Sequence, residues 1–414
     1  GFCMSIWSPT WSIEIDGVEY KDVALSNLTI SSGRNDIYTQ AIAGYLNLTL
    51  INLDDSGINP TINSGVTVFV DDSNGDPVAL FGGSITDIIV GVQSGGSIGV
   101  TQTISITALG ALSRLPKVLT EGVLSKELDG EQIYDVLAGI LFGSWNEVPA
   151  ALTWAAYNPT TTWANAENSG LGEIDEGNYE LTARSADVTD AYSLVAALAN
   201  SGLGYLYENA YGQISYADST HRSVYLASNG YIDLSANDAF ASGLQIATRS
   251  GDVRNSVTVK YKNNQQVSDS EQASIDIYGA LAQSIQTTLE NEADAISQAA
   301  FYLALRAYPR ANFNQISFPI GSPEIDDADR DNMLGVFMGM PVTINNLPNN
   351  MGTRFQGFVE GWQFQAGINS LTLSMYLTPT EFSLQAMKWN DVSGAETWNT
   401  LSNTLIWDDA FIVA

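Results

Sequence analysis

LFGGSITDIIVGVQSGGSIGVTQTISITALGALSRL (Leu80–Leu115) and RFQGFVEGWQFQAGINSLTLSMYLTP (Arg354–Pro379) are the two stretches that decide the fold. Both begin with phenylalanine, then glycine, then a β-branched residue at alternate positions: Phe81, Gly83 and Ile85 in the first, Phe355, Gly357 and Val359 in the second. Each then crosses a glycine-containing turn into a strand that alternates apolar and hydroxyl residues, Ile104–Thr107 and Leu371–Ser374. An apolar strand also precedes each stretch at a similar distance, Val66–Val70 and Val342–Ile344. The sequence therefore predicts one β-module used twice.

The first module occupies residues 1–116 in this interpretation. WSIEI and the segments after it predict about six strands, enough for a compact barrel or sandwich. DDSNGDP (Asp71–Pro77) places acidic and amide residues at alternate positions, as a calcium loop does. It lacks a glutamate at the distance that would complete such a site, and it lies between two predicted strands. We interpret it as a hairpin turn.

Residues 117–241 differ from the first module in containing helical patterns, which predicts a smaller α+β insertion. One amphipathic helix is expected to start at Asp129 and to end at Gly143, with a stripe of apolar residues facing inward. A second helix is expected from about Asp187 to Asn200. A hairpin with strands Tyr205–Tyr207 and Gln213–Tyr216 follows.

The second module is assigned to residues 242–383. NSVTVKYKN (Asn255–Asn263) alternates as a strand, and Leu289–Tyr308 is the clearest helix in the chain. That helix is expected to bury one stripe of side chains: Leu289, Ala293, Ile296, Ala300, Leu303 and Ala307. EIDDADRD (Glu324–Asp331) is interpreted as a solvated loop.

Residues 384–414 form a tail in which Trp389, Trp398 and Trp407 recur every nine residues. Each indole left in water forgoes roughly 2–3 kcal/mol of burial. The three tryptophans are therefore expected to pack, either on their own chain or across a subunit boundary, and they are candidate interface residues.

Composition excludes several functions. The chain of 414 residues carries 16 Lys+Arg against 46 Asp+Glu, a net charge of −30, so its general surface should bind neither DNA nor an anionic membrane. One cysteine and one histidine cannot supply a zinc site. That histidine, His221, is expected to be a turn or packing residue. No phosphate-binding glycine loop appears, and we expect no catalytic residues, no cofactor and no metal.

The chain resembles the tail hub family of long-tailed bacteriophages, often called minor tail proteins, which are related to the baseplate hubs of contractile tails. The resemblance rests on the order of short motifs: Gly33-Arg34, Gln40, Gly44, ALFGGSITDI, ISITALGALSRL, the helix-plus-hairpin segment ending in DSTHR, YPRANFNQISFPI and the closing tryptophan tail. It implies a virion protein at the tail tip, a homotrimer in which each chain contributes two tail-tube-like barrels, so that six barrels face a six-fold tube. It also implies that helix 289–308 covers one face of the second barrel.

The partners implied by the resemblance are further copies of the chain, a distal tail protein or the tail tube, the end of the tape-measure protein, and tip or fibre proteins. Genomic DNA would pass only transiently through the lumen, and the net charge suggests that acidic side chains line it. Two alternatives remain open at this point. One is the distal tail protein, a hexamer with a single barrel per chain. The other is a protein that binds or cleaves carbohydrate, suggested by 9 Trp and 18 Tyr.

Overall fold

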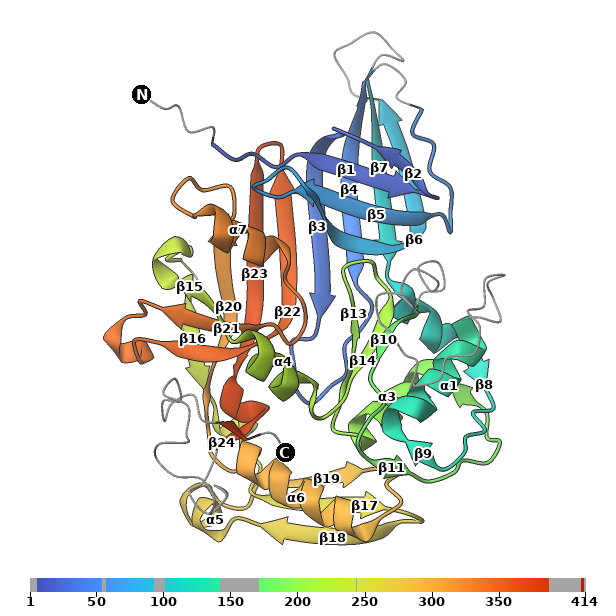
Figure 1. Ribbon diagram of the computed structural model, residues 1–414, viewed down its shortest axis with the longest axis vertical. Coiled ribbons are helices and arrows are strands. Elements are labelled where there is room, and N and C mark those ends of the chain that lie inside the picture. The colour runs from blue at the N-terminus through green and yellow to red at the C-terminus, as the bar shows by residue number, and fades with distance from the viewer. Residues whose placement is uncertain are drawn as a thin grey trace.

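The computed structural model describes residues 6–53, 57–92, 101–141, 171–242, 244–386 and 411–412 (Figure 1). Trp389, Trp398 and Trp407 lie outside these ranges, so the proposed role of the tryptophan tail stays a prediction. The described residues form a mainly β structure with helices, in which one 13-stranded sheet runs through both repeats. The predicted α+β class is confirmed.

The first half of this sheet has the strand order β2-β1-β5-β6-β7-β4-β3, with every pair antiparallel. In Figure 1 strands β1, β2 and β5 lie across β3, β4 and β7. The strands are β1 (Trp11–Ile15), β2 (Val18–Tyr20), β3 (Ala24–Gly33), β4 (Tyr45–Leu53), β5 (Gly65–Asp71), β6 (Pro77–Val92) and β7 (Thr101–Leu109).

The second half has the order β15-β21-β22-β23-β20-β16 and is antiparallel except for β15, which runs parallel to β21. Its strands are β15 (Ile232–Ser235), β16 (Gln245–Thr248), β20 (Ala311–Pro319), β21 (Pro341–Asn345), β22 (Phe355–Gly367) and β23 (Ser370–Pro379). Strand for strand, β5-β6-β7-β4-β3 corresponds to β21-β22-β23-β20-β16.

The two halves also agree in register. Val66 pairs with Gly83 in β6, and Val342 pairs with Gly357 in β22. Both long strands have an irregularity one residue past the β-branched residue of the repeat, at Thr86 and at Glu360. The predicted repeat is therefore present, with one adjustment of alignment. Ile104–Thr107 corresponds to residues 373–376 rather than to 371–374, a shift of two that keeps the same side chains facing inward.

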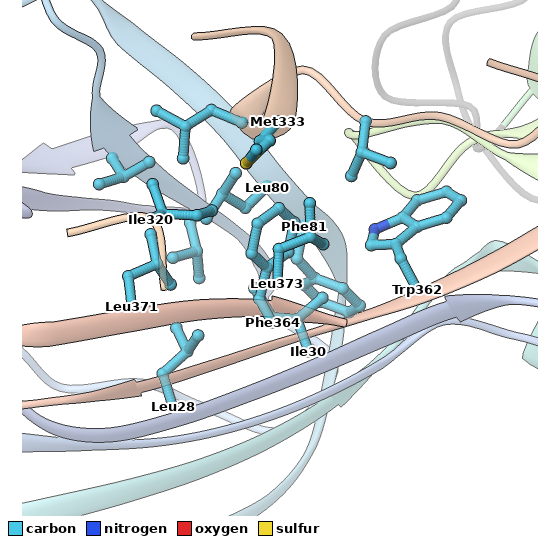
Figure 2. Close-up of a cluster of buried hydrophobic side chains, with 14 of the residues drawn as sticks. Leu28, Ile30, Leu80, Phe81, Ile320, Met333, Trp362, Phe364, Leu371 and Leu373 are labelled. Carbon is cyan, nitrogen blue, oxygen red and sulfur yellow. The ribbon is translucent and has the colours of Figure 1, made fainter. Parts of the chain in front are cut away.

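Neither half closes into a hydrogen-bonded barrel within the described residues, because the strand path is open from β2 to β16. One hydrophobic core instead joins the two halves. Figure 2 shows Leu80 and Phe81 of the first half beside Met333 and Phe364 of the second. Burying an apolar side chain of this size contributes about 1.5–3 kcal/mol, so this shared core stabilises the halves as one body.

The described residues between β7 and β15 form a smaller α+β region. The predicted helices and hairpin are confirmed with altered bounds, and Asp190 caps α3 by accepting a hydrogen bond from the Ser193 backbone N–H. A further helix, α4, begins at His221. The elements are the 3-10 helix η1 (Ala111–Lys117), β8 (Leu119–Thr120), β9 (Glu127–Leu128), α1 (Asp129–Leu141), β10 (Leu171–Ile174), β11 (Glu180–Leu181), β12 (Thr189–Asp190), α3 (Ala191–Ser201), β13 (Tyr205–Glu208), β14 (Ile214–Ala217) and α4 (His221–Asn229).

A second insertion separates β16 from β20. It forms its own three-stranded sheet, β18-β17-β19, covered by α6. Its core is shared with the first insertion, since Val257 and Val259 of β17 belong to the same cluster as Leu137 of α1 and Leu198 of α3. The elements are η5 (Ser250–Asp252), β17 (Ser256–Tyr261), β18 (Gln265–Ser270), α5 (Gln272–Tyr278), β19 (Ala282–Gln286) and α6 (Glu292–Arg306).

This arrangement corrects two expectations about the helix Leu289–Tyr308. It packs on β17 and β18 and not on the sheet of the second half. The predicted buried stripe is confirmed at Leu289, Leu303 and Ala307. In the middle of the helix it is wrong, because Ile296 is 53% exposed and Ala295 and Ala299 are buried instead. Two alanines one turn apart let the helix backbone approach the small sheet closely, and this contact overrides the position of the larger isoleucine.

The two acidic segments, Asp71–Pro77 and Glu324–Asp331, both use their carboxylates to hold the local fold. The Asp71–Pro77 segment is a hairpin turn as predicted, with the Asp72 carboxylate accepting from the backbone N–H groups of Asn74 and Asp76. Glu324–Asp331 is not simply a loop, because α7 (Asp327–Leu334) begins within it and Asp326 caps that helix. Asp331 accepts a hydrogen bond at 2.9 Å from the Ser73 backbone N–H, so the two segments meet.

Short elements complete the chain: η4 (Ala236–Asp238), η6 (Asn349–Met351), η7 (Thr380–Phe382), β24 (Gln385–Ala386) and β25 (Phe411–Ile412). Among the described residues, no helix has the length and apolar character needed to cross a membrane.

Candidate assembly site: the junction between the two halves

The two halves meet edge to edge where β22 pairs with β3. The ladder is antiparallel and runs from Gly361–Gly33 to Ala366–Leu28. Since β3 ends the first half and β22 belongs to the second, this pairing turns two sheets into one (Figure 1). It also shows how one copy of the module accepts the edge of another.

Glycine is required where the two strands cross most closely. Gly33 has φ +86°, and a Cβ there would lie 2.3 Å from the Glu360 carbonyl oxygen. A Cβ on Gly361 would lie 2.5 Å from the Arg34 carbonyl oxygen. A larger residue at either position would force the strands apart.

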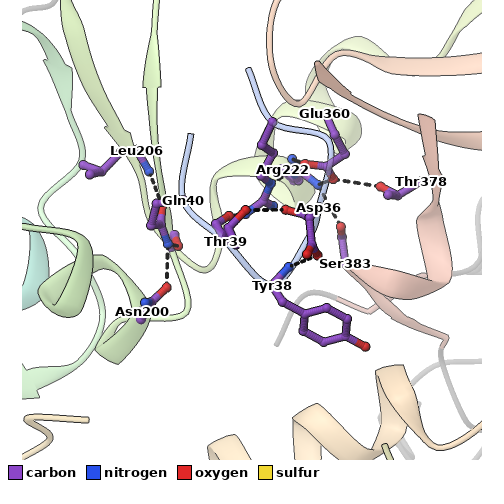
Figure 3. Close-up of polar contacts among 12 residues, drawn as sticks. Asp36, Tyr38, Thr39, Gln40, Asn200, Leu206, Arg222, Glu360, Thr378 and Ser383 are labelled. Atoms are coloured by element: carbon purple, nitrogen blue, oxygen red, sulfur yellow. Dashed lines mark hydrogen bonds and ion pairs between the residues drawn. The ribbon is translucent and has the colours of Figure 1, made fainter. Parts of the chain in front are cut away.

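A buried carboxylate lies at this crossing. Glu360 occupies the irregular position of β22 and its side chain is 1% exposed. It binds Arg34 at 2.9 Å and Arg222 at 2.7 Å, and Thr378 donates a further hydrogen bond at 2.7 Å. Figure 3 shows Glu360, Arg222 and Thr378 converging. Because Arg34 follows β3 and Arg222 lies in α4, this cluster joins the first half, the second half and the insertion.

The charges of this cluster compensate each other. Burial alone would raise the pKa of Glu360, but the guanidinium groups of Arg222 and Arg34 outweigh it and hold that pKa well below its ordinary value. Burial acts on Arg222 in the opposite sense, and the Glu360 carboxylate keeps the pKa of Arg222 above its ordinary value. Glu360 and Arg222 therefore both stay ionised although they are buried.

The segment after Arg34 ties the junction to both insertions. Gln40 donates to Asn200 of α3 at 2.7 Å and accepts from the Leu206 backbone N–H at 2.8 Å (Figure 3). Tyr38 donates to the Asp252 carbonyl oxygen at 2.8 Å. Hydrogen bonds therefore hold this segment against both insertions, and its polar side chains make those bonds.

A second buried glutamate, on another strand, binds the end of the same segment at Gly44. Glu208 of β13 accepts from the backbone N–H groups of Gly44 at 3.1 Å and Leu112 at 3.0 Å. Burial raises the pKa of Glu208 to about 8, against the lowering effect of these hydrogen bonds. The pKa values of the two buried glutamates therefore shift in opposite directions, because Glu360 has two arginine partners and Glu208 is held by backbone N–H groups.

The counterpart of the junction in the first half is open. Residues 87–92 of β6 correspond to 361–366 of β22, but within the described residues they pair with β7 alone. Val90 corresponds to Phe364, and Val90 is 61% exposed where Phe364 is 1% exposed. At the other end, β16 corresponds to β3 and is the last strand of the described sheet. Each half therefore has one unpaired edge of the kind that is paired inside the chain.

The face of the sheet opposite the core is polar, and over the central strands it is uncharged, whereas Asp87 of the neighbouring β6 is exposed. In the described strands β3, β4, β7, β20, β22 and β23 the single charged residue is the buried Glu360. Hydroxyl and amide groups pair across these strands, Thr49 with Ser105 at 2.9 Å and Ser317 with Ser374 at 2.7 Å.

The residues that define the repeat occupy equivalent places. A Cβ on Gly83 would lie 2.4 Å from the Leu109 carbonyl oxygen, and one on Gly357 would lie 2.1 Å from that of Thr378. Phe81 and Phe355 are both buried, and the Phe355 ring meets Phe313 edge-on at 5.0 Å. These four residues shape the module, and Gly357 lies against Thr378, which donates a hydrogen bond to Glu360.

Sequence reasoning missed Glu360, Arg34 and Arg222 as a unit. The available signal was a glutamate in strands that otherwise carry no charge. His221, the other candidate, binds Asp175 through Nδ1 at 2.6 Å and lies near the Tyr207 ring, as a packing residue would. Within the described ranges, no three His, Cys, Asp or Glu side chains are grouped so that they could hold a metal ion.

Comparison with known proteins finds matches by structure and none by sequence. No protein-family model and no curated protein matches the sequence. A tail protein from Neisseria meningitidis superposes with a TM-score of 0.57 at 11% identity, over 91% of this chain and 98% of that one. The 43 kDa tail protein of a Shewanella oneidensis prophage gives 0.52 at 12% identity, over 91% and 99%. The chain therefore has the fold of phage tail proteins, as the resemblance of its motifs predicted.

Proposed function

We propose that this chain is a structural protein of a phage tail, a homotrimeric hub at the tail tip that adapts a six-fold tube to a three-fold tip. One observation carries the proposal. The chain contains two halves with the same strand order and register, already joined edge to edge through β3 and β22. Three such chains in a ring would present six equivalent modules, while the contacts would alternate between those within and those between chains.

The polar face of the central strands suits the wall of a DNA channel, because it presents no charged side chain. Phosphate binding requires Lys or Arg, and the described strands β3, β4, β7, β20, β22 and β23 carry neither. If this face lines the lumen, DNA would meet hydroxyl and amide groups, which neither hold nor strongly repel phosphates. This replaces the earlier hypothesis of an acidic lining with a neutral one, and the −30 charge would then lie mainly on other surfaces.

The proposed role needs no catalysis. The two buried glutamate clusters, around Glu360 and around Glu208, join separate parts of the fold, as expected of a rigid assembly component. The neighbours would be a distal tail protein or tube end, the tape-measure protein end, and tip or fibre proteins.

The number of copies in the virion tests this function. We expect native mass spectrometry of the tail-tip assembly, or a reconstruction of intact tails, to show three copies in one ring. Six copies would instead support a distal tail protein. Release of reducing ends from host cell-wall glycan by the purified protein would support the carbohydrate alternative and contradict a purely structural role.

A further inference from the structure

A cavity of about 460 Å³ lies where the second insertion meets the junction between the two halves. Its walls come from β19 and α6 of the second insertion, from the segment after Arg34 and from the first insertion. Figure 3 shows three of the lining residues, Tyr38, Arg222 and Ser383. Small-molecule sites commonly have volumes of about 300–1,000 Å³ and lie where separate parts of a fold meet. The size and place of this cavity therefore suit a small ligand.

Arg306, the last residue of α6, contributes a buried guanidinium group to the wall of this cavity. The residue is 9% exposed. Its Nη1 atom donates to the Phe382 carbonyl oxygen at 2.6 Å, while its Nε has no hydrogen-bond partner among the described residues. The group also lies over the Phe382 ring, 4.6 Å from its centre. A guanidinium has five N–H donors, so most of its donor capacity is available to a ligand.

The other buried arginines of the described chain each have a carboxylate partner. Arg222 binds Glu360 at 2.7 Å, and Arg330 binds Asp327. Arg306 forms no ion pair with any described carboxylate. A buried cation without a counter-charge is unfavourable, and buried charges are therefore usually paired. Arg306 departs from this rule at the wall of a cavity.

The charges around the cavity also leave an excess of cations. Arg34, Arg222 and Arg306 line it, and Asp218 is the carboxylate of the described lining. Glu360 binds both Arg34 and Arg222. Three guanidinium groups therefore meet two carboxylates, in a chain whose net charge is −30. The positive charge left over belongs to Arg306, since it has no ion-pair partner among these groups.

Apolar side chains adjoin this charge. Phe301, Tyr302 and Leu305 of α6 line the cavity together with Ile285 of β19. Ligand sites of this kind combine apolar walls with a few polar groups that fix the orientation of the ligand. The walls therefore match a ligand that is charged at one end and apolar at the other.

We propose that this cavity binds a small organic carboxylate, with the carboxylate on Arg306 and the apolar body against the side chains of α6 and β19. The planar guanidinium fork matches a carboxylate in geometry, and one negative charge compensates the unpaired cation. Burial lowers the pKa of Arg306, and an anion beside it would raise that pKa again.

This inference goes beyond the proposed function, because it assigns a ligand and not an assembly contact. The cavity is lined by α6 of the second insertion and by Arg222 of α4, whose guanidinium belongs to the junction. A bound carboxylate would therefore hold the second insertion against the junction.

Calorimetric titration of the full chain with 3-phenylpropionate tests the site. We expect saturable binding of one molecule per chain. The neutral 3-phenylpropionamide should bind at least about tenfold more weakly, because it cannot form a charge-assisted hydrogen bond with the guanidinium. Equal affinities for the acid and the amide would overturn the proposal, as would an absence of saturable binding of the acid up to about 10 mM.

Arg306→Gln tests the residue. This variant removes the charge and should weaken binding of 3-phenylpropionate by about tenfold or more. Arg310→Gln is the matched control, since it removes the same charge four residues further on, at an exposed position. Its affinity should stay within about twofold of the parent. An Arg306→Gln variant that binds as tightly as the parent would overturn the assignment.

Ser284→Trp tests the cavity without changing Arg306, and it keeps the test informative if Arg306→Gln fails to fold. Ser284 is an exposed residue of β19 that lines the cavity, so a larger side chain should occupy part of it and weaken binding by about tenfold. In the parent, saturating 3-phenylpropionate should also raise the unfolding temperature, and in Ser284→Trp it should not. Unchanged binding in Ser284→Trp would overturn the site. A trimeric ring whose chains bind no carboxylate would overturn this inference and leave the proposed function intact.

Discussion

The two halves of the chain share their strand order but differ at the irregular position of the long strand. In β22 that position is Glu360, buried with Arg34 and Arg222, and the edge beyond it is covered by β3. In β6 it is Thr86, which bonds to its neighbour Asp87 at 2.7 Å beside an uncovered edge. The same module therefore forms a permanent joint in one copy and has an edge that is open, within the described residues, in the other. The difference lies in side chains, since the backbone pattern is common to both.

The largest effect is expected at the permanent joint. Glu360→Ala would leave Arg222 buried without its counter-charge and should reduce the free energy of unfolding by about 4 kcal/mol. Thr86→Ala, at the equivalent position, should change it by less than about 0.5 kcal/mol. Denaturant unfolding of both variants measures the difference, and equal effects would show that the two positions are not distinct.

Truncating the side chains beyond these positions compares a covered edge with an open one. Phe364→Ala removes a buried ring and should destabilise the isolated chain by about 3 kcal/mol. Val90→Ala, its counterpart, should leave the unfolding free energy within about 0.5 kcal/mol because the side chain is already 61% exposed. Its effect should appear in the assembly instead, as weaker association. A large loss of stability from Val90→Ala would contradict an open edge.

Close backbone approach can be tested at Gly33. Gly33→Ala introduces a Cβ 2.3 Å from the Glu360 carbonyl oxygen at a positive φ, and we expect a loss of about 2 kcal/mol. Gly17→Ala is the matched control, because Gly17 has φ +77° and nothing within 4 Å of the added atom. It should cost about 1 kcal/mol, the backbone strain alone. Thermal unfolding that shifts equally in both variants would refute the tight crossing.

The two buried glutamates predict a smaller, pH-dependent effect. Burial raises the pKa of Glu208 to about 8, above its ordinary value of 4.5, so the folded chain keeps a proton that the unfolded chain releases. Stability from Glu208 is therefore present below about pH 4.5 and is lost as the pH rises towards 8. Between pH 6.5 and 8 we expect the parent to lose about 1–2 kcal/mol more than Glu208→Gln, measured by urea unfolding. The reverse slope would show that Glu208 is ionised in the fold.

Much of the fold could be predicted from the sequence, because strand alternation and helix caps are local. The repeat of Phe81-x-Gly83 at Phe355-x-Gly357 located both halves, and the strand order agrees with it. The sequence did not predict that residues 250–306 lie outside the large sheet and share a core with the first insertion. Val257 and Val259 alternate as any sheet strand would, so their pattern could not say which sheet they join.

The junction itself could not be predicted, because its residues are far apart in the chain. Arg34 and Glu360 are 326 residues apart, and Arg222 comes from an unpredicted helix. Only the fold brings them together. The isolated glutamate in β22 was a detectable sign, since a charge in a buried strand requires partners.

The most direct test of the account is a reconstruction of the assembled tail tip that resolves the number of copies in its ring. The account predicts three chains, each with its two halves joined through β3 and β22. A ring of six chains, or chains whose two halves are separated, would contradict the claim that two joined halves let a trimer match a six-fold tube.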